Sequence, residues 1–78
     1  MKQIILTSQN DYKKTINAME RELDEIWELG LNNAELVFID EENQNLWNLI
    51  IKYLDEHKDE FSYEIVSQNN RILVTFVI

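Results

Sequence analysis

The sequence predicts a small α/β protein of the two-layer α+β kind, with two helices packed on a four-stranded mixed sheet in the order β-α-β-α-β-β. Three observations support this fold class. Runs rich in β-branched residues mark four strands, two stripes of helical periodicity separate the first three strands, and a short turn separates the last two. The 78 residues suffice for one core, so residues 1–78 are expected to form a single small globular domain.

The first strand is predicted at residues 2–7, where Ile4, Ile5 and Leu6 are consecutive. This run indicates burial on both faces and a central place in the sheet. A helix should follow from about residue 9 to residue 29, with Ser8 as its cap. Its apolar residues form one narrow stripe, namely Tyr12, Ile16, Met19, Leu23, Ile26 and Trp27. Gly30 is the only glycine and comes directly after this helix, which predicts a left-handed C-cap.

The second strand is predicted at residues 34–39, whose apolar run again indicates burial on both faces. A second helix should end near Lys58, and Asp40 or Asn43 could cap its start. Its apolar residues cover an arc of roughly 200°, wider than the stripe of an ordinary surface helix. They are Leu46, Trp47, Leu49, Ile50, Ile51, Tyr53 and Leu54. This helix is therefore expected either to be wedged between other elements or to contribute to an interface.

Residues 61–78 predict a β-hairpin, because Asn69 and Asn70 separate two strand-like runs and asparagine tolerates the positive φ of a two-residue turn. With that turn, one face is almost wholly apolar and should contact the core. It consists of the pairs Phe61/Ile78, Tyr63/Phe76, Ile65/Val74 and Ser67/Ile72. The other face is mixed, and its apolar residues are Val66, Leu73 and Val77.

Fifteen acidic and seven basic residues give a net charge of −8. Direct binding of nucleic acid or of an anionic membrane is disfavoured, because both require basic patches. A basic protein partner is favoured through electrostatic steering, although the charge could also serve solubility alone. The chain has no cysteine, and no signal peptide or membrane span is recognisable, which together favour a cytoplasmic location.

Motifs for catalysis and cofactor binding are missing. One glycine and no proline argue against phosphate-cradling loops and nucleophile elbows, so the chain is expected to have no enzymatic activity and no cofactor. His57 is the single histidine and lies among the carboxylates of residues 55–60, whose spacing matches no zinc or calcium loop. Residues 40–42 are all acidic and are explained by a position at a helix N-terminus. No metal ligands are assigned.

The second half of the first predicted helix is strongly acidic. Acids near a helix C-terminus oppose the macrodipole, so a sequence selected for stability alone would place bases there. The predicted partner-binding residues are therefore Glu20, Asp24, Glu25 and Glu28, together with Trp47 at the flank of the broad apolar arc. Core packing is the alternative for Trp47 and is the expected role of Trp27.

Two functions remain open. The first is a small acidic inhibitor or immunity-type protein that occupies the basic surface of a nuclease or another nucleic-acid-binding protein, with its acids in place of phosphates. The second is a self-associating structural or regulatory subunit, most simply a homodimer. A dimer would bury the mixed hairpin face or the broad arc of the second helix, since large apolar faces are unusual on monomers.

Overall fold

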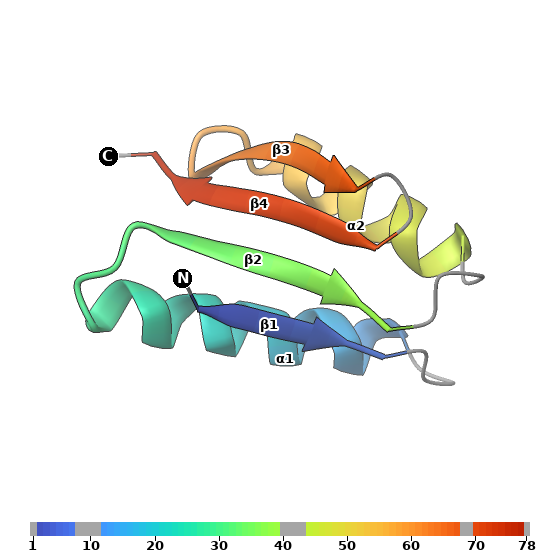
Figure 1. Cartoon of the computed structure of the whole chain (residues 1–78), viewed down its shortest axis with the longest axis horizontal. Coiled ribbons are helices and arrows are strands. Elements are labelled where there is room, and N and C mark those ends of the chain that lie inside the picture. Colours follow the sequence, from blue (N-terminus) through green and yellow to red (C-terminus); the bar gives the residue numbers. More distant parts are fainter. Residues whose placement is uncertain (1, 8–11, 40–43, 68–69, 78) are drawn as a thin grey trace.

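The computed structural model describes residues 2–7, 12–39, 44–67 and 70–77. Its elements follow the predicted order (Figure 1). They are β1 (Gln3–Leu6), α1 (Tyr12–Glu28), β2 (Asn33–Phe38), α2 (Gln44–Glu56), β3 (Phe61–Ser67) and β4 (Arg71–Phe76). The predicted fold class is confirmed: the two helices accompany a four-stranded mixed sheet that ends in a C-terminal hairpin.

The strand order is β1-β2-β4-β3, with β1 parallel to β2 and β4 antiparallel to both of its neighbours. It follows that β2 and β3 run in the same direction and that β4 lies between them. Helix α1 connects adjacent parallel strands, whereas α2 crosses over β4 to reach the far edge of the sheet. Accordingly, α1 packs on β1 and β2, and α2 packs on β3.

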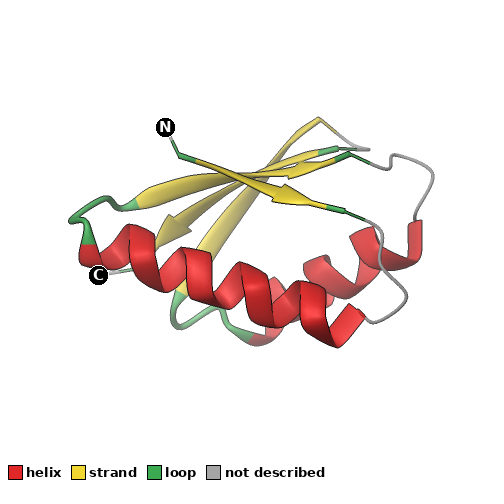
Figure 2. Cartoon of the chain, turned by 90° about the horizontal axis from the view of Figure 1, so that it is seen from below, coloured by secondary structure: helices red, strands yellow, loops and turns green. Residues whose placement is uncertain are grey.

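Both helices lie on one face of the sheet (Figure 2). The core forms between the two layers, because alternate residues of the strands point towards the helices. β2 shows this alternation clearly: Ala34, Leu36 and Phe38 are buried, and the residues between them are half-buried. The helices contribute Met19, Leu23, Ile26, Leu46, Trp47, Ile50 and Leu54, and the remaining strands contribute Ile4, Leu6, Phe61, Ile72, Val74 and Phe76.

The predicted central position of the first strand is wrong, because β1 is an edge strand. Ile4 and Leu6 are buried under α1, but Ile5 points to the uncovered face and is 50% exposed. A run of three apolar residues therefore reflects burial on one face and a partly apolar surface on the other. The same holds for β2, where Val37 is only half-buried.

The hairpin is confirmed, but its predicted register is wrong by two residues. Phe61 pairs with Phe76, and Ile65 pairs with Ile72. Because side chains alternate with a period of two, this shift leaves the strand residues that pair between Phe61 and Ile65 on their predicted faces. A bulge between Ile65 and Ser67 then brings Ser67 opposite Arg71. The pairing of Ser67 with Arg71 leaves three residues between the strands, so the predicted two-residue turn at Asn69 and Asn70 is wrong. Residues 68 and 69 lie outside the described residues.

The predicted glycine cap of the first helix is confirmed. Gly30 has a φ of +79°, in the left-handed region where glycine has no steric penalty. Its N–H donates to the Trp27 carbonyl (3.0 Å), and the Leu31 N–H donates to the Ile26 carbonyl (3.2 Å). These two bonds are the pair that defines a Schellman motif. The expected N-terminal caps, Ser8 for α1 and Asp40 or Asn43 for α2, lie outside the described residues.

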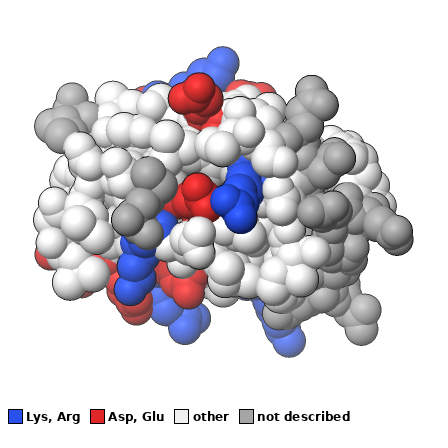
Figure 3. Space-filling model, in the orientation of Figure 1, with Lys and Arg blue, Asp and Glu red and all other residues white. Residues whose placement is uncertain are grey.

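Neither helix of the described residues lies over the second face of the sheet, which we call the open sheet face. Figure 3 shows mostly uncharged side chains around a few charged ones on this side of the molecule. The strand register places Ile5 beside Val37, and Leu73 beside Glu35, across this face. Glu35 accepts a hydrogen bond from Gln3 (2.9 Å) and lies 3.9 Å from the Arg71 guanidinium. The open sheet face is therefore apolar in part, with a charged pair near its centre.

Candidate functional site

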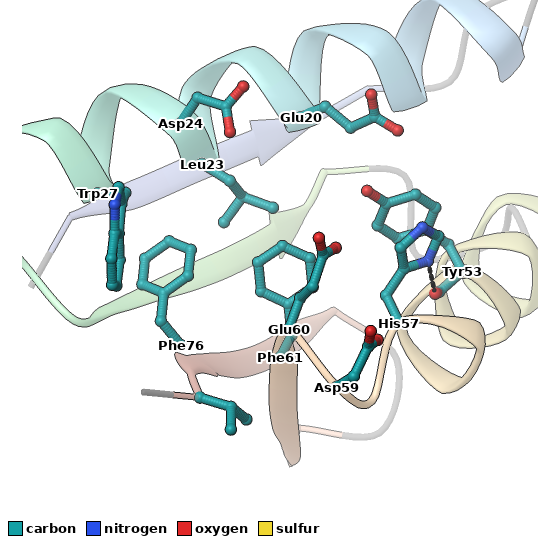
Figure 4. Close-up of a pocket in the computed structure, with 11 residues that line it drawn as sticks. Glu20, Leu23, Asp24, Trp27, Tyr53, His57, Asp59, Glu60, Phe61 and Phe76 are labelled. Carbon is teal, nitrogen blue, oxygen red and sulfur yellow. Dashed lines mark hydrogen bonds between the residues drawn. The ribbon is translucent and has the colours of Figure 1, made fainter.

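A hollow lies on the helix side of the sheet, where α1, the end of α2 and the adjoining ends of β3 and β4 meet (Figure 4). Its volume is about 500 Å³. We call it the acidic pocket, and its lining residues are Glu20, Leu23, Asp24, Trp27, Tyr53, His57, Asp59, Glu60, Phe61, Phe76 and Val77. They come from three separate stretches of the chain, which only the fold brings together.

Aromatic rings form the interior of the acidic pocket. Phe61 and Phe76 are neighbours across the β3–β4 ladder, with ring centroids 5.5 Å apart. Trp27 packs against Phe76 in an edge-to-face arrangement at 5.4 Å, yet 52% of its surface is exposed. The core packing expected for Trp27 is therefore only partial, because about half of its surface remains exposed.

A second aromatic wall comes from the end of α2. Tyr53 and His57 are one helical turn apart, and their rings stack at 4.1 Å with an interplanar angle of 25°. The His57 Nδ1 lies 2.7 Å from the Tyr53 carbonyl oxygen. Because a carbonyl only accepts hydrogen bonds, Nδ1 is the donor in this contact. This bond fixes the ring against Tyr53 and gives the wall a rigid, planar form.

Four carboxylates surround these rings. Glu20 and Asp24 project from α1, and Asp59 and Glu60 come from the segment that leads into β3. None of the lining residues is lysine or arginine. Neither helix has a basic residue in its last turn, so the negative ends of both macrodipoles also lack a neutralising side chain of their own. The acidic pocket therefore combines a negative potential with apolar walls, an arrangement that favours an organic cation.

The pKa of the Tyr53 hydroxyl reports this negative potential. Burial is the largest cause that raises its pKa above the ordinary value of 10.0. Glu20 raises the pKa further, through its charge and through a hydrogen bond to the hydroxyl. The charges of Glu60 and Asp24 act in the same direction. Three of the four carboxylates thus act on one phenol, as expected if they face a shared space.

The predicted partner-binding residues fall into three locations. Glu20 and Asp24 line the acidic pocket, whereas Glu25 and Glu28 are exposed on α1 outside it. Trp47 is only 9% exposed and packs against Phe38, with ring centroids 5.0 Å apart. Core packing, the alternative expected for Trp47, is thus what the structure shows. The half-exposed tryptophan beside the acids is Trp27.

Sequence reasoning missed the contribution of the segment that follows α2. Tyr53, His57, Asp59 and Glu60 were explained as part of an apolar arc and a solvated helix end. One local signal was present, because an aromatic residue and a histidine four positions apart lie on the same side of a helix. The approach of this segment to α1 depends on strand order, which the local sequence does not encode.

Within the described residues, no three His, Cys, Asp or Glu side chains are placed to hold a metal ion together. Residues 40–42, the second acidic cluster of the sequence, lie outside that part of the chain. In the described part of the structure, no helix is both long enough and apolar enough to cross a membrane.

A titration of Tyr53 tests the electrostatics of the acidic pocket. Glu20→Gln should lower the pKa of Tyr53 towards 10.0, but not fully to that value, because burial is the larger cause. Glu22→Gln removes the same charge from an exposed position of α1 outside the pocket and should change the pKa little. The measurement is the tyrosinate absorbance during an alkaline titration, with Tyr53→Phe to identify the transition. An identical titration in Glu20→Gln and wild type would contradict the described geometry.

The same shift has a consequence for stability. The folded-state pKa of Tyr53 is raised, so its stabilising contribution is fully present below the unfolded-state pKa near 10 and is lost as the pH rises through the folded-state pKa. Tyr53→Phe should therefore reduce the decline in the free energy of unfolding above about pH 10.

No family model, curated protein or solved structure in the comparisons matches the chain. The geometry and electrostatics of the acidic pocket are therefore the basis for a proposed function.

Proposed function

We propose that the protein is a small acidic binding module that docks on a basic surface of a partner protein, with the acidic pocket at the centre of the contact. One observation supports this most strongly: four carboxylates, with no lysine or arginine among the lining residues, surround a hollow whose walls are aromatic. A cation that enters this space would gain both charge neutralisation and aromatic contacts.

The arrangement matches the anatomy of protein interfaces. Binding energy usually concentrates in a few aromatic or arginine residues near the centre, and a polar rim surrounds them. Here the exposed part of Trp27 lies inside the hollow, and the carboxylates surround it. Beyond the pocket, Glu25 and Glu28 extend the negative surface along α1. These outer charges would mainly accelerate encounter with a basic partner, because exposed charges act more on association rate than on affinity.

The proposed partner is a nuclease or another nucleic-acid-binding protein, and the proposed role is inhibition without turnover. Proteins of this class carry clustered lysine and arginine residues that contact phosphates. An acidic surface can occupy such a cluster in place of the nucleic acid. The net charge of −8 suits this role and opposes direct contact with nucleic acid itself.

The open sheet face favours a second candidate function, namely self-association as a homodimer. The open sheet face suits a second copy of the chain, because this face carries charges of both signs: Glu35 lies on it beside Arg71. Two copies related by a twofold axis present the same surface to each other, so an acid of one copy can approach a base of the other. Ile5, Val37 and Leu73 would supply the apolar part of such a contact.

A comparison of two variants with equal charge loss tests the binding role. Glu20→Gln with Asp24→Asn removes two carboxylates from the acidic pocket, and Glu25→Gln with Glu28→Gln removes two from α1 outside it. Each protein would be used to capture partners from a lysate of the source cells, with quantification by mass spectrometry. We expect a basic protein whose recovery falls strongly for the pocket variant and less for the outer variant.

The captured protein would then be purified for measurements of association rate. The rate should fall by about tenfold between low and high ionic strength, because salt screens exposed charges. Recovery that is equal for all three proteins, or an association rate insensitive to salt, would contradict the proposed docking surface.

Sedimentation equilibrium at micromolar concentrations tests the second candidate. A dimer mass is expected for wild type, and Val37→Lys should convert it to a monomer, since it places a charge within the open sheet face. Ile39→Lys, at a residue that is 64% exposed beyond the end of β2, is the matched control. Each substitution makes the net charge less negative, so dissociation could not result from greater repulsion. A monomer mass for wild type throughout would contradict self-association.

A further inference from the structure

We propose that the acidic pocket is a receptor for one arginine side chain, presented by the basic partner. The inference rests on the proposed binding function and adds the chemistry of the central contact. The volume of about 500 Å³ is within the range of roughly 300–1,000 Å³ that is usual for ligand sites. The hollow is therefore large enough for one side chain together with the backbone that presents it.

The walls of the acidic pocket suit a planar cation. Figure 4 shows Trp27 on one side of the hollow and the Tyr53–His57 pair on the other, with Phe61 and Phe76 between them. A guanidinium is flat and weakly hydrated, so it can stack on an aromatic face at little desolvation cost. The indole of Trp27 is available for such stacking, because about half of its surface is exposed.

The positions of the carboxylates add directional recognition. Glu20 and Asp24 approach from α1, and Asp59 and Glu60 approach from the segment before β3. A guanidinium has five N–H donors in a planar fork and can bind carboxylates at more than one edge simultaneously. An ammonium is a compact, strongly hydrated point charge and would lose more hydration among these apolar walls. The geometry thus favours arginine over lysine.

Competing ligands fit less well. Phosphates and other anions are repelled, because the lining contains four acids and no lysine or arginine. A metal ion lacks a ready set of ligands, since no three suitable side chains converge within the described residues. Free arginine shares the guanidinium, but its α-carboxylate would meet the acidic rim. An arginine residue within a peptide chain has no such charge and should bind better.

An NMR titration of isotope-labelled protein tests this proposal with four small probes: N-acetyl-arginine amide, the matching lysine and citrulline amides, and free arginine. The arginine amide should give saturable shifts that include the Trp27 indole N–H and the amides of residues 57–61. Citrulline has nearly the same shape without the charge, so it should bind at least about tenfold more weakly. The lysine amide and free arginine should also bind more weakly than the arginine amide.

Variants of the same protein locate the binding. Trp27→Ala and the pair Glu20→Gln with Asp24→Asn should each weaken arginine-amide binding by about tenfold or more. Glu25→Gln with Glu28→Gln has the same charge loss as the pocket pair and should change it less than about threefold, because exposed charges outside the site are screened. Trp27 is half-exposed, so its removal should preserve the fold, which the dispersion of the amide spectrum checks.

The outcomes separate this inference from the proposed function. Absence of saturable shifts, or equal binding of the lysine amide, would overturn the arginine site even if a basic partner were captured. Tighter binding of free arginine than of the amide would overturn a protein as the source of the guanidinium. Selective binding of the arginine amide, without a basic partner in the capture experiment, would support the site and contradict the proposed function.

Discussion

The insertion of β4 between β2 and β3 is the constraint on which the rest of the structure depends. It separates the two strands that α2 connects, so α2 must cross over β4 and pack at the β3 edge, while α1 packs on β1 and β2. Both helices then occupy one face of the sheet. Between them, over Phe61 and Phe76, no further element covers the strand ends, and the acidic pocket forms there. The open sheet face results from the same topology, because both helices of the described chain lie on the opposite face.

The sequence predicted well whether each element is a helix or a strand, and which face of each hairpin strand contacts the core. Both properties depend on short-range periodicity. Apolar alternation defined which face of each hairpin strand contacts the core, and Gly30 marked the end of α1. Even the wrong hairpin register kept the correct faces, since an error of two residues equals one period of a strand. Strand order was not predictable in this way. Ile5 illustrates the limit: its apolar neighbours indicated a central strand, yet the chain places it on an edge strand with half its surface exposed.

The candidate site was predictable only in part. The excess of acids towards the end of α1 indicated Glu20 and Asp24, because their position opposes the helix macrodipole. The sequence could not indicate that Tyr53, Asp59 and Glu60 belong to the same pocket, since their approach to α1 depends on where α2 crosses the sheet. The two tryptophans illustrate the same difficulty. Both belong to apolar stripes, but Trp47 faces Phe38 in the core, whereas Trp27 lies at the end of α1 and reaches the pocket.

The central feature of the proposed site is an exposed tryptophan, Trp27, within a negative pocket. Fluorescence quenching tests this feature directly. Trp27→Phe leaves Trp47 as the only tryptophan, so the difference from wild type reports Trp27. We predict that caesium ions quench Trp27 much more strongly than iodide does, because the four carboxylates attract cations and repel anions. Trp47 should resist both ions, since it is buried. Equal quenching of Trp27 by the two ions, or stronger quenching of Trp47, would contradict the acidic pocket.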